Sequence, residues 1–430
     1  MPSTVPAALG LSLPLWSAAP FAGLLLSIAL FPLFAPALWA RHYAKVCLAF
    51  GVPVASFFLL RAPRELLHTA LEYASFLILL ASLFTISGGI LLRGTLRGSA
   101  AVNCAILAVG AALANVVGTT GASMLLVRPL LRANAHRHRS AHVVVFFIFV
   151  VANIGGALTP IGDPPLFLGY LRGVPFFWTL RAMGLLWAVA VGLVIGVFYL
   201  VDRRAFALDA AAEDPAEAVP ADASGAAAAA GEARVPLSIE GKINLPLLMV
   251  VIGAVFLPTP WREMAMAAAA AVSVWKTPAK VREENEFTWH PIEEVAILFA
   301  GIFATMIPAL LILKARGADL GVSTPAHFFW ATGMLSSFLD NAPTYLTFFS
   351  LAQGVGGTQT VAGVSAPLLQ AIGAGAVFMG ANSYIGNAPN FMVKAIAEEA
   401  GVRMPSFFGY MAWSCGILLP IFALLTVIFF

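Results

Sequence analysis

The sequence predicts an all-α polytopic membrane protein made of two inverted repeats of about five spans each. Three observations support this fold class: an apolar composition, recurrent apolar runs of span length, and one polar motif that occurs twice. The 430 residues are 60% hydrophobic and only 10% charged, whereas soluble domains carry about a quarter charged residues. The net charge of +3 comes from scattered basic residues, so we expect the lipid bilayer, and no nucleic acid, as a partner.

A helix needs about 20 apolar residues to cross about 30 Å of hydrocarbon. The predicted spans are residues 15–39, 43–60, 67–92, 141–171 and 174–201 in the first half, and 243–257, 261–275, 292–313, 365–400 and 406–430 in the second. Glycine and proline interrupt two of these spans, near Gly162 and near Gly386. Because proline removes backbone donors, both are predicted to be broken helices.

Two further apolar stretches, residues 98–132 and 325–353, are too long for one span and too short for two spans with a turn. Each carries polar residues near its middle, "ANVVGTTG" (Ala114–Gly121) and "LDNAPT" (Leu339–Thr344). A re-entrant hairpin with its polar tip inside the membrane explains both facts, since irregular backbone at that depth must face protein or a water-filled cavity. A kinked pair of short tilted spans is the alternative.

Residues 203–241 are predicted to be a flexible cytoplasmic linker, because Asp209–Arg234 is low-complexity and rich in Ala, Glu, Asp and Pro. The linker separates a first repeat, residues 1–202, from a second, residues 242–430. Placing the N-terminus outside puts most Lys and Arg residues on the cytoplasmic side. We therefore expect a multi-pass protein of the cell inner (plasma) membrane.

The motif "TPIGDPPLF" (Thr159–Phe167) returns 224 residues later as "SYIGNAPNF" (Ser383–Phe391). Upstream of the two motifs, Asn115 precedes Thr159 by 44 residues and Asn341 precedes Ser383 by 42. Five crossings per half is an odd number, so the two halves are predicted to be inverted relative to each other. Inverted repeats with broken helices are typical of secondary transporters, whose site lies at the repeat interface.

Asp163 and Asp340 are the two acids that lie deep in apolar segments. A carboxylate at the bilayer centre costs about 2.5–3.5 kcal/mol on insertion scales, which favours a functional role. Carboxylates, hydroxyls and the carbonyls of an unwound helix are hard ligands, so we predict a sodium site at these two acids. Helix caps are the alternative role for both. The full set of predicted ion- or substrate-binding residues is Asn115, Thr119, Thr120, Thr159, Gly162, Asp163, Asp340, Asn341, Thr344, Asn382, Ser383, Gly386 and Asn387.

The loop "NAHRHRSAH" (Asn134–His142) carries three histidines beside two arginines. Histidine changes its charge near neutral pH, so a pH sensor is one interpretation of this loop. A solvated loop that sets the topology is the interpretation we favour.

The segments "LTPIGDPPLFLG", "LDNAPT" and "GANSYIGNAPN" resemble the ion transporter superfamily, which includes arsenite-efflux permeases, and within it the sodium/proton antiporter and putative citrate transporter-like branch. The resemblance covers the chain apart from the linker. It implies a homodimer with a scaffold part and a transport part, and alternating access by an elevator-like movement. It also assigns Asp340, Asn341, Thr159 and Asp163 to the ion site. Ala114 departs from the pattern, because some antiporters have an aspartate there.

The favoured function is a sodium/proton antiporter, since two membrane acids without a buried basic partner suit cations. The alternative is a sodium- or proton-coupled carrier of an anion such as citrate or another carboxylate, held by helix N-termini. A membrane-embedded enzyme is disfavoured, because all seven histidines lie at span ends or in loops. The sequence contains no nucleotide-binding motif, which disfavours a primary pump. No cofactor is expected beyond the transported or coupling Na⁺ and H⁺.

Overall fold

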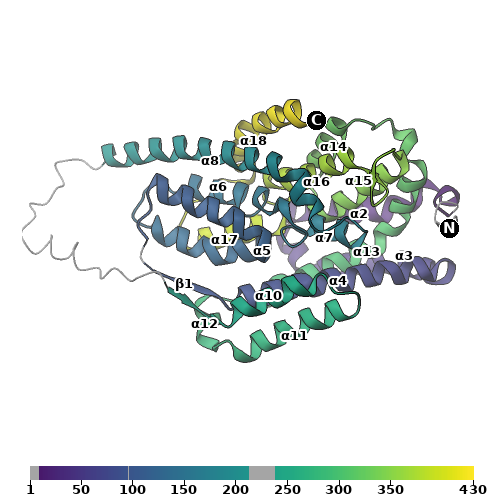
Figure 1. Cartoon of the computed structure of the whole chain (residues 1–430), viewed down its shortest axis with the longest axis horizontal. Helices are drawn as coiled ribbons and strands as arrows, with labels where there is room; N and C mark the ends of the chain where they lie inside the picture. The colour runs from purple at the N-terminus through teal and green to yellow at the C-terminus, as the bar shows by residue number, and fades with distance from the viewer. Residues whose placement is uncertain (1–8, 95, 213–237) are drawn as a thin grey trace, which may run out of the picture.

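The computed structural model describes residues 9–94, 96–212 and 238–430, and these are mostly helical (Figure 1). The first half contains η1 (Leu15–Ala18), α2 (Ala19–Phe34), α3 (Pro36–Arg61), α4 (Pro63–Ser87), α5 (Ala100–Ala133), α6 (Ala141–Val150), η2 (Ile154–Leu158), α7 (Pro164–Leu171) and α8 (Trp178–Ala212). The second half contains α10 (Asn244–Ala254), α11 (Trp261–Lys276), α12 (Ala279–Glu284), α13 (His290–Arg316), η4 (Gly317–Leu320), α14 (Pro325–Ser336), α15 (Asn341–Val355), α16 (Ala366–Met379), η5 (Gly380–Asn382), α17 (Ala388–Glu399) and α18 (Phe407–Phe429). Strand β1 (Leu91–Arg93) pairs with β2 (Ser238–Glu240), and β3 (Thr360–Val361) pairs with β4 (Val364–Ser365).

Eight helices of the described chain are long and apolar enough to cross a membrane. They confirm the all-α membrane-protein class, but six of them lie in the first half and only α13 and α18 in the second. The predicted spans 243–257 and 261–275 are shorter helices of 11 and 16 residues, or about 16 and 24 Å long. The chain leaves helical geometry after Ala254 and then passes Pro258 and Pro260 before α11 begins.

The predicted end of the first span and the predicted start of the linker are both wrong. The predicted span 15–39 stops at Phe34, because Pro36 starts a new helix that continues to Arg61. Residues 203–212 of the predicted linker continue α8, and residues 238–240 form β2. The remaining linker residues, 213–237, lie outside the described residues.

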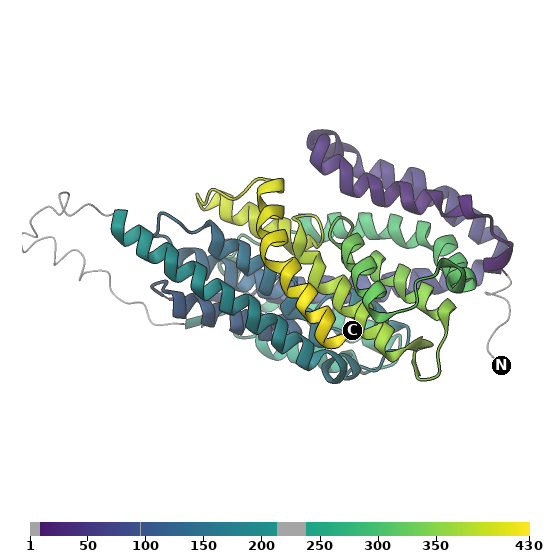
Figure 2. The same ribbon diagram turned by 90° about the horizontal axis from the view of Figure 1, so that it is seen from above.

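The helices form two groups. The flanking group consists of α2–α4 and α10–α13, in which α3 packs on α13, α11 packs on α4, and α4 and α13 pack on each other. The central group consists of α5–α8 and α14–α18. Figure 1 places α3, α4, α10 and α11 along one side of the molecule and α8 and α18 along the other, with α5 and α17 between them, and Figure 2 shows α2 and α3 as an outlying pair. The groups meet where α13 packs on α15 and where α4 packs on α5 and α7.

Helix α5 doubles back on itself at Gly118, whose φ of 78° and ψ of 157° interrupt the helix. The amide of Gly98 donates a hydrogen bond of 2.7 Å to the carbonyl of Ala133, although a straight helix of this length would separate its ends by about 50 Å. Only glycine adopts this backbone conformation readily, so the reversal is fixed at that residue. Helices α14 and α15 form the second folded pair, joined by the turn 337–340.

The central group contains two interrupted helices, between α6 and α7 and between α16 and α17. In each interruption, two glycines six residues apart bring their backbones together. A Cβ atom on Gly162 would lie 2.1 Å from the carbonyl oxygen of Gly156, and one on Gly386 would lie 2.5 Å from that of Gly380. Both glycine pairs are related by the same 224-residue offset as the sequence motif.

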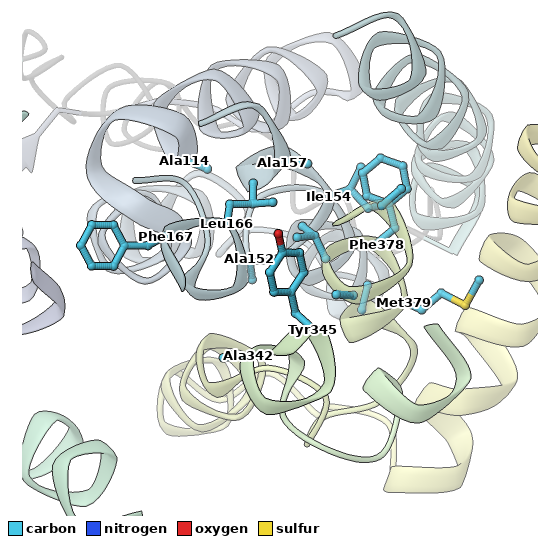
Figure 3. Packing of buried hydrophobic residues seen from close by; sticks show 14 of the residues in the cluster. Ala114, Ala152, Ile154, Ala157, Leu166, Phe167, Ala342, Tyr345, Phe378 and Met379 are labelled. Atoms are coloured by element: carbon cyan, nitrogen blue, oxygen red, sulfur yellow. The ribbon is translucent and has the colours of Figure 1, made fainter. Parts of the chain in front are cut away.

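Buried apolar side chains fill the space around these interruptions. Tyr345, which projects from α15, reaches toward Leu166 of α7 and Ala152 (Figure 3). A Cβ atom on Gly169 of α7 would lie 2.3 Å from the Tyr345 hydroxyl oxygen, so the small residue allows α7 and α15 to approach closely. The two halves of the chain therefore share one core rather than forming separate ones.

Gly162→Ala should lower the free energy of unfolding by about 1–3 kcal/mol, because the added methyl group collides with rigid backbone. Gly192→Ala is the matched control, since a Cβ atom there meets nothing within 4 Å. The control should leave stability unchanged or raise it by up to about 1 kcal/mol, because alanine is the better helix former. Titration with a denaturing detergent measures both variants, and equal stability of the two would contradict the close approach.

Candidate functional site

Four elements of the central group meet at the carboxylate of Asp163, which is only 1% exposed. Its Oδ1 accepts hydrogen bonds from the Thr119 hydroxyl at 2.8 Å and from the Asn387 amide at 3.1 Å. Its Oδ2 accepts a hydrogen bond from the Asn341 amide. Thr119 begins the second arm of α5, Asn341 begins α15, and Asn387 directly precedes α17. One carboxylate thus joins both folded pairs and both interruptions.

Asp163 stands at the N-cap position of α7 but makes no capping hydrogen bond. The next two residues, Pro164 and Pro165, have no backbone N–H groups, so the usual partners of a cap are absent or displaced. The carboxylate instead faces the side chains of the other elements. Of its two predicted roles, the structure therefore excludes the helix cap.

Asp340 does act as a helix cap. Its Oδ1 accepts a hydrogen bond of 3.0 Å from the backbone N–H of Ala342, at the start of α15. Among the described residues, no hydrogen bond connects Asp340 with Asp163. The adjacent Asn341, rather than Asp340, carries the contact of the second folded pair with that carboxylate.

Each folded pair is anchored to the interruption of its own half. The Thr159 hydroxyl donates to the carbonyl of Asn115 at 2.6 Å, and the backbone N–H of Thr119 donates to the carbonyl of Gly162 at 2.8 Å. In the second half, the Ser383 hydroxyl donates to the carbonyl of Ser337. Each interruption thus exchanges hydrogen bonds with its folded pair, and the carbonyl of Gly162 receives the donor that unwound backbone needs.

The remaining predicted residues occupy less central positions. Asn382 donates to the Ser337 hydroxyl at 2.9 Å, and Thr344 donates to the carbonyl of Asp340 within its own helix. Thr120 is half-buried and makes no side-chain hydrogen bond with the described residues. Asn115 also differs from its predicted counterpart Asn341. It lies before the reversal of its pair, whereas Asn341 lies after it and corresponds in position to Thr119.

Sequence reasoning missed two asparagines that hold the two interruptions together. The Asn153 amide donates to Asn390 Oδ1 at 2.7 Å, and the Asn387 amide reaches Asn153 Oδ1 at 3.3 Å. Asn390 also donates to the carbonyls of Gly380 and Ser383. Two features of the sequence could have indicated these residues. Asn390 lies one helical turn after Asn387, and Asn153 is the polar residue at the end of an apolar run. Neither feature indicates that Asn153 and Asn390 contact each other.

Two buried amide oxygens, Asn341 Oδ1 beside Asp163 and Asn382 Oδ1 in the second interruption, have no hydrogen-bond partner among the described residues. Amide oxygens are hard acceptors that suit a small cation or a hydroxyl donor from a ligand. No group of three or more His, Cys, Asp or Glu side chains in the described chain could hold a metal ion. The donor set thus fits an ion such as sodium better than a transition metal.

The charged residues on neighbouring helices are already paired with acids. Arg172 contacts both oxygens of Glu72 at 3.2 and 3.0 Å, and Lys394 contacts Glu398 at 2.8 Å. Arg128 pairs with Glu286. No Lys, Arg or His side chain of the described chain donates a hydrogen bond to Asp163. The site therefore combines one carboxyl group with neutral donors and helix ends.

Thr119→Val should lower the free energy of unfolding by about 1.5–3 kcal/mol, because the buried Asp163 carboxylate loses one of its donors. The adjacent Thr120→Val is the control and should stay within about 0.5 kcal/mol of the wild type. Detergent-induced unfolding of both variants gives the comparison. If Thr120→Val lowered the free energy of unfolding as much as Thr119→Val, the hydrogen bond between Thr119 and Asp163 would have no special role.

The family of the chain follows from comparison with known proteins. A search of curated proteins finds no match. A protein-family model described as "putative citrate transport" matches residues 10–430. The chain therefore belongs to this family of membrane transporters.

Proposed function

We propose that the protein is a secondary active carrier of citrate or another carboxylate anion, coupled to Na⁺ or H⁺. The family match favours this anion carrier, which was the alternative in the sequence analysis, over the antiporter. The observation that carries the proposal is the convergence of helix N-termini at Asp163. The second arm of α5, α7, α15 and α17 all begin at residues that form or contact this site.

Helix N-termini offer partial positive charge to an anion without any Lys or Arg. Here Asp163 already lies among them, so a second carboxylate beside it would meet like charge. A sodium ion or a proton on Asp163 removes that repulsion and lets the substrate bind. The unpaired oxygen of Asn341, whose amide N–H contacts Asp163, supplies a further ligand for the cation. Substrate and cation would therefore bind together, which is the basis of coupled transport.

The proposal includes two inverted repeats with re-entrant hairpins. Apart from the short α12 of the second half, both halves have the same order of α-helices: three helices, a folded pair, an interrupted helix and a last helix. Their packing is reciprocal, since α5 contacts α17 and α15 contacts α7. An N-terminus outside and a cytoplasmic linker in the inner (plasma) membrane complete the proposed topology. The resemblance also implies a homodimer. The molar mass of the purified protein in detergent tests this, since a dimer has twice the mass of one chain.

In the proposed alternating-access movement, the central group shifts relative to the flanking group. Arg172 follows α7, and Glu72 belongs to α4, so their ion pair crosses between the groups. Glu72 is buried, and its carboxylate contacts the guanidinium through two oxygens. Such a pair stabilises the arrangement seen here and must break when the groups slide.

Glu72→Gln should shift the population away from this arrangement and change the transport rate by severalfold. The matched control is Glu398→Gln, which removes an exposed pair within a single helix. Cysteine cross-linking between α4 and α7 measures the population. Unchanged cross-linking and transport in Glu72→Gln would contradict a crossing contact that regulates the movement.

Radiolabelled citrate uptake into proteoliposomes under an imposed Na⁺ or pH gradient tests the function. Asp163→Asn should reduce gradient-driven uptake at least tenfold, because the variant cannot exchange a cation at this site. Asp340→Asn should retain most activity, since asparagine is an equally good helix cap. Failure of any carboxylate to accumulate under either gradient would overturn the carrier proposal. Loss of uptake in Asp340→Asn would restore that acid to the ion site.

The sodium/proton antiporter is the second candidate. The observation that favours it is the Asp163 carboxylate, held by three neutral donors with no cationic partner in the described chain. Fluorescence dequenching in acid-loaded proteoliposomes separates the two functions. Proton release on addition of Na⁺ or Li⁺, without any carboxylate present, would favour the antiporter.

A further inference from the structure

The loop between α5 and α6 is only partly the solvated loop that the sequence predicts, because His136, His138 and Arg139 are exposed whereas Arg137 is buried. Asn134, Arg137 and His142 are buried, and Asp202 of α8 lies beneath them. Asp202 Oδ1 lies 2.5 Å from Arg137 Nη1 and 2.8 Å from His142 Nε2. Asn103 donates to Asp202 Oδ2 at 3.0 Å. The loop is therefore fixed to α5 and α8 by a buried polar network.

Above this network lies a pocket with a volume of about 940 Å³. Five arginines and two histidines line it, and none of its lining residues in the described chain is acidic. The arginines are Arg132, Arg137, Arg139, Arg204 and Arg403. Nearby acids are Asp202 beneath the pocket and Asp209, whose carboxylate is 3.9 Å from Arg139 Nε. The two aspartates pair with Arg137 and Arg139, and the lining itself carries five arginines without an acid, so the pocket wall is cationic.

Arg137 has donors that its protein partners leave unused. Its Nε and Nη2 atoms are buried and have no hydrogen-bond partner among the described residues. The ring of Phe206 lies against its guanidinium, with 3.8 Å from Cζ to the ring centroid. Asp209 Oδ2 lies 3.8 Å from Nε and is itself buried without a hydrogen-bond partner among the described residues, so the two groups form an ion pair without a hydrogen bond. A buried guanidinium with free donors needs an acceptor, which a bound oxyanion would supply.

The other walls of the pocket are apolar and include Leu131, Val201, Leu208 and Trp413. They belong to the ends of α5, α8 and α18, helices that are long enough to cross a membrane. A cationic end beside an apolar wall matches a ligand with an anionic head and hydrocarbon chains. The pocket is separate from Asp163, because Leu130 follows Thr119 by eleven positions of the α5 arm, a rise of about 16 Å.

We propose that this pocket binds the phosphate headgroup of an acidic phospholipid. The Arg137, Arg139 and Arg204 guanidiniums contact the phosphate, and the acyl chains follow the wall formed by Leu208 and Trp413. Arginine suits this role because its planar fork pairs with phosphate oxygens. In the proposed topology the pocket faces the cytoplasmic leaflet, where acidic lipids attract basic residues. The bound lipid would fix the ends of α5 and α8 at the membrane surface.

Native mass spectrometry of the full-length protein with phosphatidylglycerol or phosphatidylcholine tests this site. Wild-type protein should bind phosphatidylglycerol at least tenfold more tightly than phosphatidylcholine. The double variant Arg139→Gln/Arg204→Gln should bind phosphatidylglycerol about 30-fold more weakly, as expected for the loss of two surface cations. Arg403 lies in the loop before α18, on another wall of the pocket. Arg403→Gln should therefore also weaken the binding of phosphatidylglycerol.

The control is Arg97→Gln/Arg203→Gln, which removes two exposed arginines that do not line the pocket. The control should bind phosphatidylglycerol within threefold of wild type. Equal binding by the wild type and the Arg139→Gln/Arg204→Gln variant would overturn the proposal. Displacement of the lipid by millimolar inorganic phosphate or citrate would also overturn it, by identifying a free anion as the ligand. None of these measurements depends on the transported substrate.

Discussion

The contact on which the rest of the site depends is the buried carboxylate of Asp163 with its three donors. Thr119, Asn341 and Asn387 come from three separate elements and reach the same two oxygens. A buried carboxylate without such partners would be strongly destabilising, and each neutral donor removes part of that cost. The two folded pairs and the two interruptions must therefore assemble together. The charge fixes their relative positions more strictly than apolar packing alone could do.

A second constraint links each interruption to its folded pair. An unwound helix leaves backbone groups that hydrocarbon cannot satisfy, so other protein groups must bind them. Thr119 satisfies the carbonyl of Gly162, and Ser383 uses the carbonyl of Ser337. The tip thus satisfies the interruption at Gly162, whereas the interruption satisfies the tip at Ser337. Asn153 and Asn390 extend this network between the two interruptions.

The central group has two polar regions of opposite character. Around Asp163, one anion lies among neutral donors and helix N-termini. At the far end of α5, arginines outnumber acids, and the buried Asp202 organises Arg137 and His142. The first region suits a cation with a bound anion, and the second suits a phosphate. Because the α5 arm connects them, a ligand that holds its far end would also restrain the tip that carries Thr119.

The sequence by itself determined the membrane class, the two interruptions, the two folded pairs and the repeated motif. These features are local, because composition, glycine and proline act on the chain where they stand. The sequence did not predict the lengths of α10 and α11 or the continuation of α8 through residues 203–212. Each of these depends on how the helix packs against its neighbours.

Only the tertiary structure decided which polar residues meet. Thr119 and Thr120 are neighbours, but one contacts Asp163 and the other does not, because helix geometry points adjacent side chains in different directions. Asp340 caps its own helix, while Asn341 beside it reaches the other half of the chain. Asn153 and Asn390 lie 237 residues apart in sequence. The physical reason is that such contacts depend on how distant segments are brought together, which no local pattern specifies.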